Sequence, residues 1–251
     1  MRKPLNFMLK HLGVELHKYV PIKTPLGHAI DTIAYSLNHT PPNDFLIELA
    51  TNAITRAWQT EIDNKDTLHL NDSHYFNIYP GEHYRLLKAI ALELKPKTVV
   101  EIGTHTGMGS LALTQGLPQA SKVHTYDIVS WDQLPSHLNK NFFSSKKITQ
   151  HLFNLADLEH FSSNQDIIES AEFIFCDGPK DGDFEYKFIS NLSTLKPSKC
   201  RILMLDDIRF KNMIDLWQSI NSPKLDLSSF GHWSGTGLVD ISNGLQIKQF
   251  S

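Results

Sequence analysis

Three acidic residues that directly follow apolar runs offer the clearest chemistry in this sequence. Asp177 follows the run at residues 171–176, and Asp206 and Asp207 follow the run at residues 200–205. If the two runs are neighbouring parallel strands, the three carboxylates meet at one edge of a sheet and repel one another unless a cation lies between them. Oxygen ligands at an open site suit Mg²⁺ or Ca²⁺. The pattern therefore predicts a metal site formed by these three aspartates.

Lys180 lies three residues after Asp177 and offers a base for the same site. A metal ion could hold and polarise a substrate hydroxyl, and Lys180 would then take the proton if the metal and burial depress its pKa. A structural alternative remains open. In it Asp177 caps a turn, Asp206 and Asp207 cap the next helix, and Lys180 is a surface charge.

A glycine-rich turn follows the predicted strand at residues 98–102. Gly103 and Gly107 let the backbone turn tightly and approach a ligand closely, and the helix that follows offers free N–H groups to an anion. The spacing differs from the Gly-x-Gly-x-x-Gly pattern of dinucleotide enzymes. Glu101, just before the turn, suits a cationic group such as the ammonium of a methionine moiety and suits a pyrophosphate poorly. The turn therefore favours a methionine-type cofactor.

Asp127 ends the apolar run at residues 122–127, after the glycine-rich turn. An acid at this position can accept hydrogen bonds from both ribose hydroxyls of an adenosyl ligand. The alternative is a solvated carboxylate at a strand end. Together with the glycine-rich turn, Asp127 predicts a ribose contact.

Alternating helix and strand patterns must position these side chains. Strands are expected at residues 98–102, 122–127, 148–153, 171–176, 200–205, 225–230 and 236–242, and helices at residues 82–94, 107–115, 134–141, 184–195 and 210–220. A short acidic helix is expected after the third strand. Such alternation implies right-handed crossovers and helices on both faces of the sheet. The fold class predicted is α/β: a Rossmann-like, doubly wound, mostly parallel seven-stranded sheet.

The chain before Gly81 has a different pattern. Helical spacing of apolar residues predicts helices at residues 5–20 and 44–62, and residues 63–79 are polar and aromatic-rich, which is typical of a loop or lid. We therefore expect a helical N-terminal extension or lid at residues 1–80 and one catalytic domain at residues 81–251.

Composition narrows the class of partners and the compartment. The formal net charge of -3 argues against nucleic acid as a partner, and the absence of an apolar run of about 18 residues argues against a membrane span. Cys176 and Cys200 both lie in apolar runs, as free thiols do, and the N-terminus lacks the apolar core of a signal peptide. A cytoplasmic protein without nucleic-acid or membrane partners is expected.

The segment from residue 81 to residue 241 resembles the class I S-adenosylmethionine-dependent methyltransferases. In detail it is similar to the metal-dependent O-methyltransferases of the catechol O-methyltransferase type. Residues 101–107, Glu-Ile-Gly-Thr-His-Thr-Gly, match the glycine motif of that family. Residues 177–181, Asp-Gly-Pro-Lys-Asp, look like its metal-aspartate and catalytic-lysine segment, and residues 205–207, Leu-Asp-Asp, look like its Asp-Asn metal pair.

The resemblance implies a role for each matching residue. S-adenosylmethionine would be bound by Glu101, Gly103, Thr104, Gly107, Ser110, Asp127 and Asp177. Mg²⁺ would be bound by Asp177, Asp206 and Asp207, with Lys180 as the catalytic base. Asp207 stands where that family commonly has Asn, a pattern closer to the sugar O-methyltransferases. The serine expected after the glycines falls at Gly109 or Ser110.

Several interpretations stay open. The acceptor is expected to be a small molecule or a sugar, and the extension is a plausible homodimer element. The chain could instead be a metal-free methyltransferase acting on nitrogen or another nucleophile, with structural carboxylates, or a non-catalytic cofactor-binding module. His105 contacts the ligand or faces solvent, His232 borders the acceptor pocket or packs under the final hairpin, and no histidine is assigned to a metal.

Overall fold

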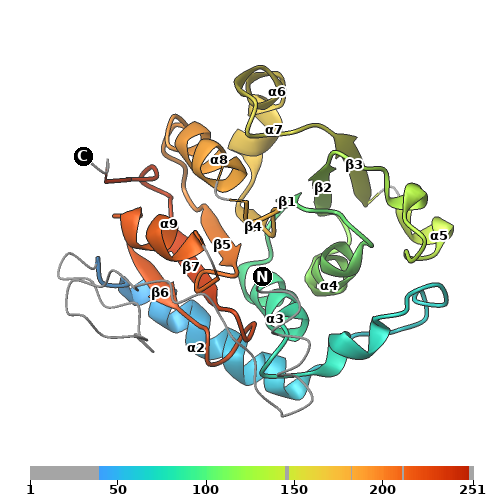
Figure 1. Ribbon diagram of the computed structural model, residues 1–251. Coiled ribbons are helices and arrows are strands. Elements are labelled where there is room, and N and C mark those ends of the chain that lie inside the picture. Colours follow the sequence, from blue (N-terminus) through green and yellow to red (C-terminus); the bar gives the residue numbers. More distant parts are fainter. Residues whose placement is uncertain (1–39, 145–146, 182, 211, 249–251) are drawn as a thin grey trace, which may run out of the picture. The chain divides into compact units, whose positions relative to one another are not determined.

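A seven-stranded sheet organises the part of the chain that the computed structural model describes, residues 40–144, 147–181, 183–210 and 212–248. The strands are β1 Thr98–Ile102, β2 Lys122–Asp127, β3 Ile148–Leu152, β4 Phe173–Cys176, β5 Ile202–Asp206, β6 Lys224–Asp226 and β7 Thr236–Asp240. Their order across the sheet is β3-β2-β1-β4-β5-β7-β6, with β1 to β5 parallel and β7 antiparallel to both of its neighbours (Figure 1). The predicted doubly wound, mostly parallel sheet is confirmed. The helix predicted at residues 5–20 lies outside the described residues.

Helices cover both faces of this sheet. They are α2 Asp44–Gln59, α3 Tyr84–Leu94, α4 Met108–Gly116, α5 Lys140–Phe143, α6 Leu158–Ser163, α7 Gln165–Ser170, α8 Phe184–Leu192 and α9 Met213–Ser219, with 3-10 turns at Ser73–Asn77 and Trp131–Gln133. Figure 1 shows α2, α3 and α4 on one side of the sheet and α7, α8 and α9 on the other. None of the helices in the described ranges is long and apolar enough to cross a lipid bilayer.

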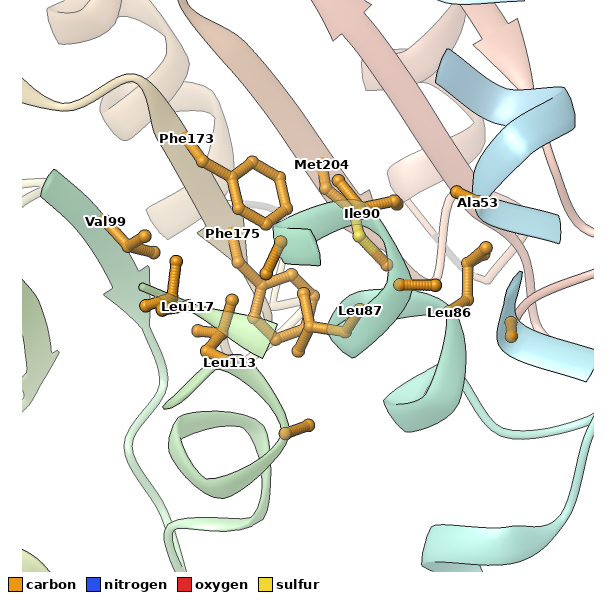
Figure 2. Packing of buried hydrophobic residues seen from close by; sticks show 14 of the residues in the cluster. Ala53, Leu86, Leu87, Ile90, Val99, Leu113, Leu117, Phe173, Phe175 and Met204 are labelled. Atoms are coloured by element: carbon orange, nitrogen blue, oxygen red, sulfur yellow. The ribbon is translucent and has the colours of Figure 1, made fainter. Parts of the chain in front are cut away.

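The largest apolar cluster fixes α3 against the middle of the sheet. Leu86, Leu87 and Ile90 face Phe175 of β4 and Met204 of β5 in Figure 2, and all five side chains are almost completely buried. Burying an aliphatic side chain of this size is worth about 1.5–3 kcal/mol. The packing therefore holds the start of α3, and the residues just before it, beside the carboxyl ends of β4 and β5.

Helix α2 packs on α3 in the same core. Its small residues Ala50, Ala53 and Ala57 are buried and allow the two helices to approach closely. Asn43 begins the helix by accepting a hydrogen bond of 2.9 Å from the Leu46 amide on its side-chain oxygen. The predicted helix at residues 44–62 is thus confirmed, and it ends at Gln59. That residues 1–80 form a lid remains a prediction.

The helix predicted at residues 134–141 is wrong. Leu134 has an extended backbone (φ -83°, ψ 141°), as is usual for a residue that precedes proline, here Pro135. A new short helix begins only after Asn139, whose side chain accepts a hydrogen bond from the Asn141 amide. The proline and the capping asparagine therefore divide the segment.

The strand predicted at residues 225–230 is shorter than expected. β6 ends at Asp226, where the carboxylate accepts hydrogen bonds from the backbone amide and hydroxyl of Ser228 and turns the chain. The remaining predicted strands agree with the observed ones to within two residues at either end.

Gly103 brings the carboxyl ends of three strands together. Its amide donates to the carbonyl of Tyr126 at 2.9 Å, and the Asp177 amide donates to the carbonyl of Ile102 at 2.9 Å. The residue has φ +93°, and a Cβ atom built on it would lie 2.1 Å from the Asp177 carbonyl oxygen. Any larger residue would therefore separate the turns that follow β1 and β4.

We predict that Gly103→Ala destabilises the fold more than Gly244→Ala. Gly244 has a similar φ of +91° but no atom within 4 Å of an added Cβ, so it carries the backbone penalty alone, about 1–2 kcal/mol. Gly103→Ala should cost about 1–3 kcal/mol more because of the collision with the β4 turn. Urea unfolding of both variants measures the difference, and equal costs would contradict the close approach described here.

Candidate active site

A cleft of about 900 Å³ opens at the carboxyl ends of β1, β2, β3 and β4. This is the edge where ligands bind in open parallel sheets. Its walls include Ile102, Gly103, His105, Tyr126, Asp127, Ile128, Val129, Phe153, Asn154, Ala156, Asp157, Leu158, Asp177, Gly178, Pro179, Asp181, Asp183, Phe184 and Lys187. The cleft thus runs from the glycine-rich turn to the first of the three predicted metal aspartates.

Asp127 stands in this cleft and orders its rim. One carboxylate oxygen accepts the His105 amide at 2.8 Å, and the other accepts the amides of Ile128 at 2.7 Å and Val129 at 3.1 Å. A carboxylate offers about four acceptor positions, so these three bonds leave room for another donor. The arrangement can hold a hydroxyl donor at the mouth of β2.

The predicted cofactor residues divide into two groups. Gly103, Asp127 and Asp177 line the cleft. Glu101, Thr104, Gly107 and Ser110 lie in β1, in the turn after it and in α4 and are not among the residues that line the cleft, and contact between these four residues and a cofactor stays a prediction. Their packing is tight, since the hydroxyls of Thr104 and Thr125 are 2.7 Å apart.

Glu101 is the most buried charged group of the glycine-rich turn. Its side chain has no exposed surface, and Ser110 donates its hydroxyl proton to one carboxylate oxygen, while the other oxygen has no hydrogen-bond partner. Burial raises the pKa of Glu101 to about 7, and the hydrogen bonds from Ser110 and Thr125 only partly oppose this effect. The group therefore titrates near neutral pH.

The three predicted metal aspartates do converge. β4 and β5 are neighbouring parallel strands, and Asp177, Asp206 and Asp207 follow or end them at the same edge. The Lys180 ammonium lies among them: its Nζ forms an ion pair with Asp177 and is 2.8 Å from Asp207 Oδ2 and 3.9 Å from Asp206 Oδ2. Three carboxylates and one ammonium leave a net negative cluster.

The charges in this cluster shift one another's ionisation. Burial lowers the pKa of Lys180, but the surrounding carboxylates of Asp177, Asp206 and Asp207 outweigh it and hold the pKa well above its ordinary value. Burial and the neighbouring Asp206 raise the pKa of Asp177, although Lys180 opposes them. As arranged here, Lys180 is an ion-pair partner, and its role as a base requires that another cation replace its charge.

Positive φ angles concentrate in the site. Among the described non-glycine residues, four have φ above zero, and three of them are His105 (φ 40°) in the cleft, Lys180 (φ 54°) and Asp207 (φ 57°). Left-handed backbone costs about 1–2 kcal/mol in residues that carry a Cβ. Such strain is typical of functional positions, where it aims a side chain that regular structure would direct elsewhere.

Two histidines join the cluster: His83, which the sequence did not assign to the site, and His232, which was expected to border the acceptor pocket or to pack under the final hairpin. His83 Nδ1 lies 3.3 Å from Asp206 Oδ1. His232 Nδ1 lies 3.1 Å from Asp207 Oδ1, and its Nε2 lies 3.3 Å from Glu82 Oε2. Burial disfavours the charged form of His232, but the bonds to Asp207 and Glu82 raise its pKa to about 10. His232 therefore belongs to the charged cluster as well as to the final hairpin.

A short bridge between distant segments explains why the histidines were missed. The Gly81 amide donates to the Gly231 carbonyl at 3.0 Å, and the Trp233 amide donates to the Gly81 carbonyl at 3.0 Å. This pairing brings the residues before α3 next to the segment between β6 and β7. The contact depends on tertiary packing between segments about 150 residues apart, which no local sequence pattern indicates.

Apolar residues of the cleft were also missed. Ile128, Val129, Phe153 and Leu158 line it, and their side chains are 74%, 37%, 38% and 63% exposed. All of them follow β2 or β3, so the rule that selected Asp127 would have selected this region too. An exposed apolar wall beside a polar anchor is typical of a binding site for a flat heterocycle.

Comparison with known proteins places the site in a family context. A family model described as O-methyltransferase matches residues 68–215, and no curated protein matches the chain. Solved structures with a similar chain fold include a putative caffeoyl-CoA O-methyltransferase from Staphylococcus aureus, at 16% identity, 62% of this chain, 81% of that chain and a TM-score of 0.47. A methyltransferase from Podospora anserina with bound SAH is 15% identical, and the match covers 93% of this chain and 100% of that chain with a TM-score of 0.44. An O-methyltransferase from Bacillus cereus in complex with SAH is 14% identical, and the match covers 79% of this chain and 91% of that chain with a TM-score of 0.42.

We predict that ionisation of Glu101 makes the fold less stable as the pH rises. Between about pH 4.5 and 7 the folded protein keeps a proton on Glu101 that the unfolded chain has lost, so the free energy of unfolding should fall through this window by at most about 3 kcal/mol. Glu101→Gln cannot ionise and should flatten this slope. Urea unfolding from pH 5 to 8 measures it, with Glu61→Gln on the exposed surface as the control. Equal slopes in wild type and Glu101→Gln would show that Glu101 ionises normally.

Proposed function

We propose that the protein transfers the methyl group of S-adenosylmethionine to a hydroxyl of a small molecule or sugar with the help of a divalent metal ion. The chain belongs to the O-methyltransferase family, because the family model matches residues 68–215, more than half of this chain. The observation that carries this proposal is the double position of Asp177. The residue lines the cleft, and its carboxylate forms part of the carboxylate cluster. A methyl donor in the cleft can therefore direct its reactive carbon toward the cluster.

The cleft offers a separate contact for each part of the cofactor. The free acceptor positions of Asp127 suit the ribose hydroxyls, and the exposed apolar residues after β2 and β3 suit the adenine ring. The methionine part would lie at Gly103 and at the start of α4, where Gly107 provides no side-chain cap and the first amides of the helix suit a carboxylate.

The carboxylate cluster has the donors that a divalent ion needs. Lys180 balances one of the three negative charges of Asp177, Asp206 and Asp207, and one buried oxygen of Asp206 has no hydrogen-bond partner among the described residues. Carboxylate oxygens are the preferred ligands of Mg²⁺. A divalent cation bound there would supply positive charge that lowers the pKa of an acceptor hydroxyl.

Lys180 would accept the proton of the acceptor. In the transfer, the bond between the sulfonium sulfur and the methyl carbon breaks, a carbon–oxygen bond forms, and the hydroxyl proton leaves. Once another cation balances Asp177, Asp206 and Asp207, the Lys180 amine is no longer required as their counter-charge and can act as a base. The remaining contribution of the chain is to hold donor and acceptor in line.

Asp207 supports a sugar among the possible acceptors. The family resembled in sequence commonly has Asn at this position, and the Asp-Asp pair is closer to the sugar O-methyltransferases. Burial raises the pKa of Asp207, but the hydrogen bond from His232, the charge and hydrogen bond of Lys180 and the hydrogen bond from Ser234 together hold it below its ordinary value. It therefore stays charged and able to bind a cation.

One observation favours a second candidate, a metal-free methyltransferase. The Lys180 ammonium already lies among the three carboxylates, as it would if they were structural. In this case Lys180 would stay protonated. The acceptor would be a group such as a neutral amine, which attacks the methyl carbon through its own lone pair and needs no base beforehand. Dependence on a metal separates the two candidates.

We predict that Asp127→Asn weakens binding of S-adenosylhomocysteine by about 10- to 100-fold, the loss expected for a hydrogen bond to a charged group. The substitution preserves size but replaces one carboxylate oxygen with an N–H₂ donor, so it removes acceptor positions for a ribose hydroxyl together with the acceptor of one set of rim amides. Calorimetric titration measures the affinity. Asp132→Asn, an exposed acid in the next turn, is the control and should bind as the wild type does. Unchanged affinity in Asp127→Asn would place the ribose elsewhere.

We predict that Asp206→Asn removes binding of divalent ions and methyl transfer, while S-adenosylhomocysteine still binds within about twofold of wild type, because Asp206 is outside the described cleft wall. Wild-type activity should likewise be lost in excess chelator and return with Mg²⁺ or another divalent ion. Calorimetry with the metal and a methyl-transfer assay test this. Full turnover in chelator, with Asp206→Asn still active, would favour the metal-free candidate.

A further inference from the structure

The side chain of His83 is buried without a hydrogen bond. It is 3% exposed, and neither ring nitrogen has a hydrogen-bond partner among the described residues. The Asp206 oxygen that faces it, Oδ1, is also buried and also has none. Nδ1 and Oδ1 are 3.3 Å apart, the distance of an ion pair when the imidazole is protonated. Buried polar atoms left in this way cost free energy unless another group completes them.

The position of His83 is fixed by its surroundings. It lies directly before α3, which the main apolar cluster holds against β4 and β5. Its ring packs beside Tyr84, Phe175 and His232, at centroid distances of 4.5, 5.2 and 5.4 Å. These contacts leave the ring little freedom to rotate away from Asp206. A rigid, unpartnered nitrogen directed at a carboxylate is suited to coordination.

The same nitrogen belongs to a set of possible ligands. One donor atom each of His83, Asp177 and Asp206 lie within 4.8 Å of one another. Ligand bonds of about 2.0–2.2 Å, as imidazole and carboxylate form with first-row metals, place donor atoms at most about 4.4 Å apart, so these three atoms need only small movements to share one ion. Asp177 and Asp206 are the carboxylates proposed above for the divalent ion, so this argument rests on the proposed function.

We propose that His83 is a nitrogen ligand of this ion and that the site consequently prefers a first-row transition ion, such as Mn²⁺, Co²⁺ or Zn²⁺, over Mg²⁺. Imidazole is a good ligand for transition ions, whereas Mg²⁺ takes oxygen donors and keeps its water. Three aspartates alone would form a hard oxygen site. The histidine before α3 changes its chemistry, and it does so from a segment 94 residues before Asp177 in the chain.

The test uses the whole chain, freed of metal and then loaded with Mn²⁺ at about pH 8, where ligands are deprotonated. Electron paramagnetic resonance measures bound Mn²⁺, and its electron spin-echo modulation detects a directly coordinated ¹⁴N nucleus. We expect ¹⁴N modulation in wild type and none in His83→Phe, which retains a ring for the aromatic neighbours. His69→Phe replaces an exposed histidine and should keep the signal.

Affinities give a second readout. Co²⁺ should bind wild type more tightly than Mg²⁺. His83→Phe should lose at least about tenfold in Co²⁺ affinity, because loss of a residue that only hydrogen-bonds to a metal ligand already costs this much. The same substitution should change Mg²⁺ affinity less. His83→Asn keeps a polar atom near the position of Nδ1. It provides the comparison if His83→Phe does not fold, and it should also lose the imidazole modulation.

The outcomes separate this inference from the proposed function. Binding of Mn²⁺ without ¹⁴N modulation, or modulation that survives in both His83 variants, would overturn the role of His83 and leave the carboxylate site intact. Loss of modulation in both variants, with Mn²⁺ still bound, supports it. If wild type binds no divalent ion, the metal site of the proposed function fails, and the inference fails with it.

Discussion

Repulsion among Asp177, Asp206 and Asp207 is the constraint on which the rest of the site depends. The parallel pairing of β4 and β5 brings these carboxylates to one edge, and burial strengthens their interaction. The chain compensates with Lys180, whose left-handed backbone turns its side chain back among them, and with His232 beside Asp207. Ser234, which follows His232 in the chain, adds a hydrogen bond from its hydroxyl to Asp207.

The charged cluster is built from four separate segments of the chain. Residues 81–83 precede α3, residues 177–180 follow β4, residues 206–207 follow β5, and residues 231–234 lie between β6 and β7. The apolar packing of α3 on β4 and β5 fixes the first segment, and the antiparallel β7 beside β5 fixes the last. A change in the core under α3 would therefore alter the charge balance of the cluster without touching it.

Local patterns predicted much of this fold. Short β-branched runs that alternate with amphipathic helices indicated the parallel strands, and the carboxyl-end rule correctly brought Asp177, Asp206 and Asp207 together and put Asp127 in the cleft. The family match confirms the predicted methyltransferase. The contacts of His83 and His232 could not be predicted, because they depend on tertiary packing between segments about 150 residues apart. The helix expected at residues 134–141 failed because Pro135 outweighed a favourable apolar spacing.

The carboxylate of Asp177 also bears on how the proposed site distinguishes the methyl donor from the spent product. A sulfonium donor carries a positive charge, whereas the thioether product is neutral. Asp177 lines the cleft and belongs to the cluster, so it attracts the reactive end of the donor but not that of the product. In the proposed reaction this difference would favour exchange of the neutral product for a new charged donor. During the transfer positive charge moves from the sulfur toward the acceptor, where the carboxylates around Lys180 can still stabilise it.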